Sequence, residues 1–151
     1  KLQKVCSIVK GLKEIHDNQM VHHDFHTGNI LFNDPSIETF IYISDMGLCR
    51  QVGNVDTTDI YGVMPYLSPE VLKGNPYTQA ADIYSFGMIM YFVATGRQPF
   101  DNCAHDHNLA LDICKGDRPG INELEAPKCY IDLMERCWNA NPNNRPNITE
   151  L

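Results

Sequence analysis

Two features that would mark other protein classes are missing from this sequence. It has no block of like charges, since 12 Lys and Arg stand against 19 Asp and Glu for a net charge of −7. This acidic balance argues against binding to the phosphate backbone of nucleic acid. The longest uncharged stretch, 83–96, has 14 residues and is too short to span a bilayer. We therefore expect neither a nucleic acid partner nor a membrane partner.

The cysteines and the first residues also lack a pattern typical of secreted proteins. None of the six cysteines forms a CxxC pair, and the first twenty residues do not show the basic and then apolar order of a signal peptide. An apolar content of 43% over 151 residues is enough for one domain with its own core, so disulfides are not needed. We expect reduced thiols and a cytoplasmic location.

The spacing of apolar residues predicts that most of the chain is helical. Apolar side chains recur every three or four residues over 2–18, which is typical of one face of a helix. The segment 78–94 is apolar on nearly all sides and predicts a buried helix. Stop signals place two more helices over 105–115 and 126–139, and 148–151 resembles a first helical turn.

Short strands and one long loop complete the expected fold. Two apolar clusters, 30–32 and 40–43, are separated by turn-forming residues and predict two strands. Residues 47–65 have no sustained period and predict a long polar loop, which in a compact domain is typical of a functional segment. Ser68 precedes Pro69 and predicts the capped start of a short helix. The expected fold class is mainly α with short strands.

Three polar side chains carry the chemistry that the residues suggest. Asp24 and Asn29 lie in a polar loop between a helix and a strand, and Asp45 directly follows the strand that ends at residue 43. Carboxylate and amide oxygens are hard ligands, which suit magnesium and not zinc. A second carboxylate close to such a site can orient a hydroxyl and accept its proton.

Five motifs, taken in order, resemble the carboxyl-terminal lobe of a protein kinase. The family's catalytic loop, metal-binding loop, activation-segment end, central helix and late arginine are matched by 22–24 with Asn29, 45–47, 68–70, 82–87 and 145–146. The resemblance covers essentially the whole chain. It is greatest for the tyrosine-kinase-like group, whose members mostly modify serine or threonine.

The resemblance implies an activity and a set of site residues. The activity is transfer of the γ-phosphoryl group of ATP to a hydroxyl of a protein substrate, with serine or threonine favoured. Asp24 would act as the base, with His26 beside it in the catalytic loop. Asn29 and Asp45 would hold Mg²⁺, and Leu31 would join them in binding ATP.

The resemblance also implies structural roles around this site. His22 and Met46 would pack against each other beneath it. Asp82 would accept hydrogen bonds from the backbone of the catalytic loop. Glu70 and Arg145 would form a buried ion pair that holds the activation segment to the last helices.

Several positions depart from the family pattern. No glycine-rich loop and no VAIK-type lysine precede the catalytic loop. We therefore expect residues 1–151 to be a partial kinase domain, an α+β kinase fold with the large lobe only. Its small lobe would lie upstream, and we expect little activity from this chain alone.

His23 stands where an arginine usually engages a phosphorylated loop, so control through the possible phosphosites Thr57 and Thr58 is not expected. His26 replaces the usual lysine and Val63 its threonine partner.

The same residues allow three other interpretations. A pseudokinase-like scaffold would keep the fold without transferring phosphate, and the missing lysine favours it for this chain alone. A small-molecule phosphotransferase shares the HxDxxxxN pattern but would not combine it with Asp82 and Arg145 in their motifs. A zinc site at His22 and His26 lacks the glutamate that the HExxH pattern needs.

Overall fold

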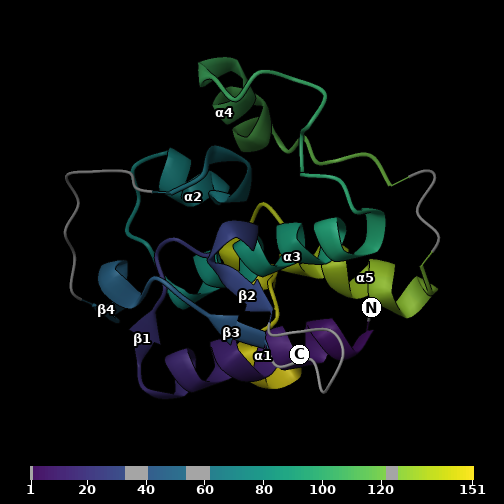
Figure 1. The fold of residues 1–151 in the computed structure, drawn as a ribbon. Coiled ribbons are helices and arrows are strands. Elements are labelled where there is room, and N and C mark those ends of the chain that lie inside the picture. Colours follow the sequence, from purple (N-terminus) through teal and green to yellow (C-terminus); the bar gives the residue numbers. More distant parts are fainter. Residues whose placement is uncertain (1, 33–40, 54–61, 122–125) are drawn as a thin grey trace.

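The computed structural model describes residues 2–32, 41–53, 62–121 and 126–151. Its body is helical and is arranged around α3 (Gln79–Thr95), as Figure 1 shows. Helices α1 (Leu2–Asp17) and α5 (Lys128–Cys137) pack against α3, whereas α2 (Pro69–Leu72) packs against α4 (His107–Lys115). The mainly helical fold class that the sequence predicts is confirmed.

Helix α3 is the buried centre of the fold. All of its residues from 81 to 91 are buried, and only Asp82 among them is charged. The helix begins after Thr78 and ends at Gly96, whose φ of +74° closes the last turn in the left-handed region. The predicted buried helix over 78–94 is therefore confirmed, with each end shifted by one residue.

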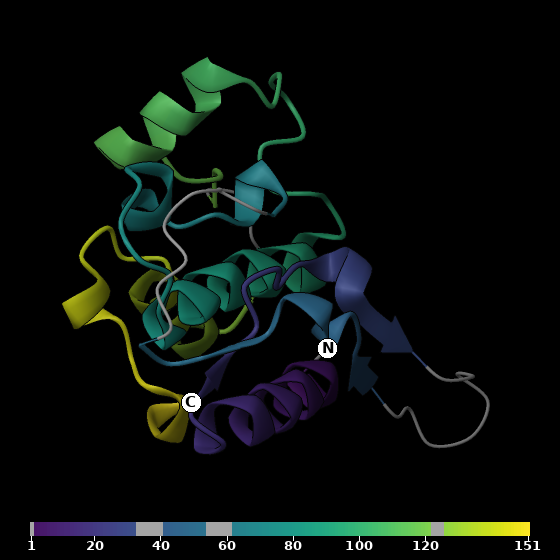
Figure 2. The same ribbon diagram turned by 90° about the vertical axis from the view of Figure 1, so that its left-hand side faces the viewer.

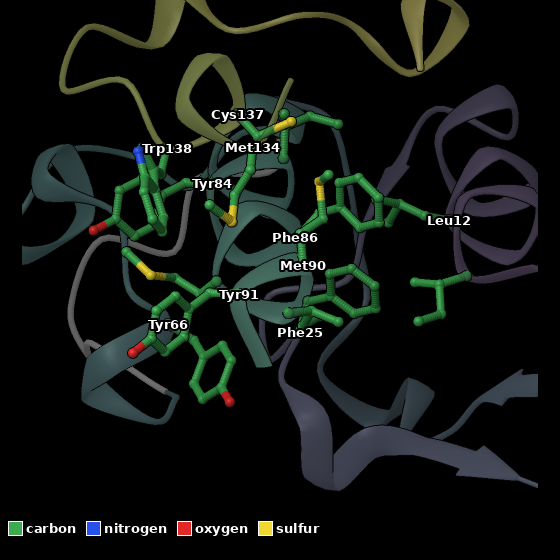
Figure 3. Packing of buried hydrophobic residues seen from close by; sticks show 14 of the residues in the cluster. Leu12, Phe25, Tyr66, Tyr84, Phe86, Met90, Tyr91, Met134, Cys137 and Trp138 are labelled. Atoms are coloured by element: carbon green, nitrogen blue, oxygen red, sulfur yellow. The ribbon is translucent and has the colours of Figure 1, made fainter. Parts of the chain in front are cut away.

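The hydrophobic core lies between α3 and its two neighbours (Figure 3). It includes Leu12 of α1, Phe86 of α3 and Met134 of α5, each fully buried. Helices α3 and α5 approach closely at Gly87, where a β-carbon would lie 3.0 Å from Cβ of Cys137. Since any larger residue would push the helices apart, this glycine sets the depth of the α3–α5 contact.

Four short strands form two separate antiparallel pairs. β2 (Ile30–Phe32) pairs with β3 (Ile41–Ile43) at the edge of the helical body, as Figure 2 shows. β1 (Met20–Val21) pairs with β4 (Arg50–Gln51). The first pair matches the two predicted strands, although residue 40 lies outside the described residues. The second pair was not predicted, because strands of two residues are too short to show an alternating pattern.

The predicted loop over 47–65 is only partly a loop. It contains β4 and parts of two 3-10 turns, Met46–Leu48 and Met64–Tyr66. The possible phosphosites Thr57 and Thr58 lie outside the described residues. Tight turns of this kind have no apolar period, so the sequence pattern could not separate them from irregular chain.

Helix ends also differ from the predictions. The Ser68 side chain makes no capping hydrogen bond, so α2 begins with Pro69 at its first position and no side-chain cap. Helix α4 begins at residue 107 because Asp106 accepts hydrogen bonds from two backbone amides of its first turn. Helix α5 is shorter than the predicted 126–139, and the expected last helical turn is a 3-10 turn, Ile148–Glu150.

The lengths of the described helices and the state of the cysteines can be compared with the expectations from the sequence. None of the described helices combines the length and the apolar character that crossing a bilayer requires. All six cysteines are free thiols. Burial raises the pKa of Cys49 to about 11 and that of Cys137 to about 12, so both buried thiols are protonated at neutral pH.

Candidate active site

The loop between β1 and β2 places Asp24 and Asn29 in direct contact. The Asn29 Nδ2 group donates a hydrogen bond of 2.8 Å to the Asp24 carbonyl oxygen and one of 3.3 Å to Asp24 Oδ2. A 3-10 turn over Thr27–Asn29 closes the loop and brings the two residues together. The spacing of five residues that the sequence analysis singled out is therefore a contact across one tight loop.

One oxygen of Asp24 has no hydrogen-bond partner. Asp24 Oδ1 is buried, and His26 Nε2 lies 3.5 Å from it. His26 Nδ1 accepts a hydrogen bond of 3.0 Å from the Gly28 amide, so in neutral His26 the ring proton is on Nε2, facing Asp24. A buried carboxylate oxygen without a partner is costly to keep, which marks it as an acceptor for a group that binds there.

Gly62 lies next to this oxygen. A β-carbon at Gly62 would lie 3.4 Å from Asp24 Oδ1 and 2.9 Å from Leu67 Cδ2, and the residue has a φ of +119°. Glycine is favoured here by the backbone conformation, and an added β-carbon would also displace the end of the Leu67 side chain next to the carboxylate. The sequence analysis did not single out Gly62, because only the fold brings it to Asp24.

We expect Gly62→Ala to impair the site more than a glycine replacement in open space. Gly74→Ala is the matched control, since Gly74 also has a positive φ, +81°, but nothing lies within 4 Å of its added β-carbon. Both changes force alanine into a positive φ, which costs about 1–3 kcal/mol. Only Gly62→Ala adds clashes, so it should lower both the melting temperature and the activity of the full-length protein further. Equal effects of the two changes on both readouts would contradict this.

The β2–β3 pair brings Asp45 to the same end of the hairpin as Asn29. Ile30 lies opposite Ile43, and the Ser44 amide donates a hydrogen bond of 2.8 Å to the Asn29 carbonyl oxygen. Asp45 is the next residue, exposed and with a left-handed φ of +57°. Aspartate adopts this conformation more readily than most residues, and such backbone is common at functional sites.

The oxygen donors at this end of the hairpin fit a hard divalent cation. They are the exposed Asp45 carboxylate and the Asn29 amide oxygen, which stays available because Nδ2 is used on Asp24. Within the described ranges, no group of three or more His, Cys, Asp and Glu side chains could hold a metal ion. A zinc site at His22 and His26 therefore has no support there.

Asp82 accepts a hydrogen bond from the backbone of the catalytic loop, as expected. Its Oδ2 accepts a hydrogen bond of 2.8 Å from the His22 amide and lies 2.9 Å from Nε2 of His16. The His22 ring is held in turn, with Nε2 3.0 Å from the Ser44 carbonyl oxygen and Nδ1 accepting from the Asp24 amide at 3.3 Å. The contribution of His16 was missed, because a single histidine in a helix gives no sequence signal.

The expected packing of Met46 beneath the site is wrong. Met46 is 46% exposed, and its sulfur lies 3.5 Å from the Cys49 thiol. His22 packs against Phe25 instead, with ring centroids 5.5 Å apart. The reason is local: the left-handed residue Asp45 is followed by a 3-10 turn, and this turn leaves residue 46 at the surface.

Leu31 lies on the open face of the hairpin. It is 51% exposed, and Tyr42, its partner across the strands, is 56% exposed. An adjacent pair of exposed apolar side chains next to the oxygen donors can contact a bound ligand or another part of the protein. Tyr42 was not predicted as a site residue, because the strand pattern did not show which face is covered.

Glu70 and Arg145 form the buried ion pair that the sequence analysis expects. Their two contacts measure 2.6 and 2.7 Å, and the Arg145 side chain is fully buried. Arg145 also donates hydrogen bonds of 2.8 Å to the carbonyl oxygens of Ala80 and Asn139. Burial alone would raise the pKa of Glu70, but the hydrogen bonds and charge of Arg145 hold it below 4.5.

His23 is committed to a stacking contact. Its ring lies 4.5 Å from the Tyr77 ring at an angle of 18°, and its φ is +70°. Burial lowers the pKa of His23, although the nearby Asp82 carboxylate opposes this. A neutral, stacked histidine is a poor phosphate ligand, which supports the prediction that this position does not engage a phosphorylated loop.

A groove of about 310 Å³ lies beside the catalytic loop. It is lined by His26, Thr27, Gly28, Val63, Pro65, Tyr66, Gln98, Pro99 and His105. These residues come from the catalytic loop, from the segment before α2 and from the chain after α3. The groove therefore runs next to the Asp24 carboxylate through their shared neighbour, His26.

The chain was compared with known families and proteins. The family model described as "Protein kinase domain" matches residues 3–151. The chain belongs to the protein kinase family. Its motifs therefore occur within a match over nearly the whole sequence. The assignment to the tyrosine-kinase-like group stays a prediction.

Named relatives of this kinase-family chain are serine/threonine-protein kinases. Serine/threonine-protein kinase STY17 of Arabidopsis thaliana is 28% identical over 151 residues, covering 99% of this chain and 26% of that protein. "Probable serine/threonine-protein kinase roco8" of Dictyostelium discoideum is 34% identical over 158 residues, covering 99% of this chain and 8% of that protein. The chain spans between 8% and 26% of the length of the first curated relatives.

Proposed function

We propose that this chain carries the catalytic loop of a protein kinase that transfers the γ-phosphoryl group of ATP to a serine or threonine hydroxyl of a protein substrate. The observation that carries the proposal is the Asp24–Asn29 pair, in which Asn29 fixes the carboxylate and one oxygen is left without a partner. The relatives named as serine/threonine-protein kinases support the same substrate class.

Asp24 is the base in this proposal. Its free Oδ1 accepts the proton of the substrate hydroxyl and orients that hydroxyl for attack. Asn29 holds Oδ2 by a hydrogen bond and His26 lies 3.5 Å from Oδ1, so little reorganisation of the carboxylate is needed at the moment of reaction. The groove beside His26 accommodates neighbouring residues of the protein substrate.

Asn29 and Asp45 are the magnesium ligands in this proposal. When bound, the cation neutralises charge on the phosphates of ATP. The chain's own contribution is positional: the β2–β3 pair sets the distance between the two oxygen donors, and Leu31 offers an apolar surface next to them.

We infer that residues 1–151 form the large lobe of a kinase domain whose small lobe lies in a longer protein. The chain covers only 9% and 26% of the length of two relatives, which supports this inference. No lysine of the VAIK pattern occurs in the sequence, so the phosphate contacts of that lysine would come from the small lobe. The six free thiols favour a reducing compartment such as the cytoplasm.

The test is phosphoryl transfer by the full-length protein with Mg²⁺ and ATP. Asp24→Asn keeps the shape of the side chain but removes the base, so turnover should fall about 10²–10⁴-fold. Binding of ATP should change little, because Asp24 acts on the acceptor. Asp132→Asn, an exposed carboxylate on α5, is the control and should leave turnover unchanged.

Two results would contradict the proposal. Turnover of Asp24→Asn equal to that of the control would remove Asp24 as the base. A folded full-length protein that transfers no phosphate to any of a panel of protein substrates would favour the scaffold reading instead.

A further inference from the structure

Three side chains form a closed ring of hydrogen bonds at the wall of the groove. Thr27 Oγ1 lies 3.0 Å from the Tyr66 hydroxyl, which lies 2.6 Å from Gln98 Oε1. Gln98 Nε2 lies 3.4 Å from Thr27 Oγ1 and closes the ring. The residues come from the catalytic loop, the segment before α2 and the chain after α3, so the ring ties three distant parts of the sequence together.

The donors in this ring can be assigned in one consistent direction. Tyr66 donates to Gln98 Oε1, which is a pure acceptor, so its oxygen is free to accept from Thr27. Gln98 Nε2 then donates to Thr27 Oγ1. Because each group in the ring both donates and accepts once, the three bonds strengthen one another.

Tyr66 is held rigidly at the other end. Its side chain is 4% exposed, and its carbonyl oxygen accepts a hydrogen bond of 2.8 Å from Ser85 of the buried helix α3. Burial raises the pKa of Tyr66 to about 12, so the hydroxyl keeps its proton at neutral pH. The ring is therefore attached to the buried central helix of the fold.

On the other side, the ring reaches Asp24 through the catalytic loop. Thr27 begins the 3-10 turn that ends at Asn29, and Asn29 donates two hydrogen bonds to Asp24. His26, which caps this turn and lies 3.5 Å from Asp24 Oδ1, also packs near Tyr66 with ring centroids 6.0 Å apart. Moving Thr27 would thus move both of the side chains that hold the Asp24 carboxylate.

We propose that Tyr66 and Gln98 are positioning residues, which act through Thr27 to hold the catalytic loop in the geometry that presents Asp24 to the substrate hydroxyl. This inference rests on the proposed function. It assigns to this chain a direct hydrogen-bonded link between the catalytic loop, the segment that leads into α2 and the chain that follows α3.

The experiment compares isosteric changes within the ring. Tyr66→Phe removes only the hydroxyl, and Thr27→Val removes the hydroxyl of Thr27 at equal volume. Each should lower kcat of the full-length protein about tenfold to a hundredfold, with KM for ATP nearly unchanged. The reason is that a small displacement of the Asp24 carboxylate slows the chemical step. Thr27→Ser keeps the hydroxyl and should retain most of the kcat of the unchanged protein.

Tyr130→Phe is the matched control. The Tyr130 hydroxyl donates a buried hydrogen bond of 2.6 Å to the Met90 carbonyl oxygen, far from Asp24 in sequence and on the α3–α5 side of the core. Its loss should lower the melting temperature about as much as Tyr66→Phe does, yet leave kcat unchanged. If Tyr66→Phe and Tyr130→Phe give equal kcat values, Tyr66 is structural and the proposal is wrong.

Hydrogen exchange separates this inference from the proposed function. The amides of Asp24, Gly28 and Asn29 are hydrogen-bonded within the loop, so Tyr66→Phe and Thr27→Val should speed their exchange and Tyr130→Phe should not. Faster exchange in a protein that transfers no phosphate would keep the ring as the holder of the loop and refute the kinase activity. Unchanged exchange would refute the ring's role, whatever the activity.

Discussion

Replacing Arg145 with alanine is expected to lower the free energy of unfolding by about 3–5 kcal/mol, because it leaves the partly buried Glu70 carboxylate without its partner. Glu70 is the acceptor of both guanidinium contacts. The same change also leaves the carbonyl oxygens of Ala80 and Asn139 without these donors. Chemical denaturation of the purified chain measures the difference.

Arg136→Ala is the matched control for this prediction. Arg136 also faces a glutamate, Glu150, but at 3.7 Å and with both side chains about half exposed. An exposed pair contributes about 0–1 kcal/mol, so the control should be close to the unchanged protein. Equal losses for Arg145→Ala and Arg136→Ala would show that the buried pair does not hold the fold.

The effect of Arg145→Ala should also depend on pH. Since the folded-state pKa of Glu70 lies below its ordinary value of 4.5, the pair stabilises the fold above about pH 4.5 and this stabilisation is lost as the pH falls through the folded-state pKa. Without Arg145, the largest effects that lower the pKa of Glu70 are lost, while burial still favours its protonated form. The gap between the two proteins should therefore be widest at neutral pH and narrow in acid. A gap that widens in acid would contradict the assignment.

Removing the Asp45 carboxylate is expected to reduce phosphoryl transfer by the full-length protein to background. In the proposed function Asp45 is one of the two magnesium ligands, and Asn29 alone offers only a neutral oxygen. Asp45→Asn is the sharper variant, because asparagine also tolerates the left-handed φ of +57° that alanine does not favour. Asp45→Ala, in contrast, combines the loss of charge with backbone strain.

Metal titration distinguishes this role from a general defect. Asp45→Asn should melt like the unchanged protein, since its side chain is exposed and makes no capping hydrogen bond. Its Mg²⁺-dependent binding of ATP should be lost, and excess Mg²⁺ should restore part of it. Asp101→Asn, which removes an exposed carboxylate paired with Arg97, is the control. Turnover of Asp45→Asn at the level of this control would exclude Asp45 as a ligand.

Features that depend on residues close together in the chain could be predicted before the structure was known. The apolar pattern located α1 and the buried helix α3, because a buried helix face requires apolar residues three and four positions apart. The sequence also placed Asp24 and Asn29 in one polar loop, and the structure adds the contact between them. The Glu70–Arg145 pair, 75 residues apart, was predicted only through the family resemblance.

The contacts that hold the site depend on the packing of distant segments and could not be predicted from local sequence. The Thr27–Tyr66 and Tyr66–Gln98 contacts join residues 39 and 32 positions apart, and the approach of Gly62 to Asp24 Oδ1 depends on the path of a separate segment. Such contacts arise where packed elements meet, and no local pattern records them. Met46 shows the converse, because one left-handed residue before it was enough to leave a side chain exposed that was expected beneath the site.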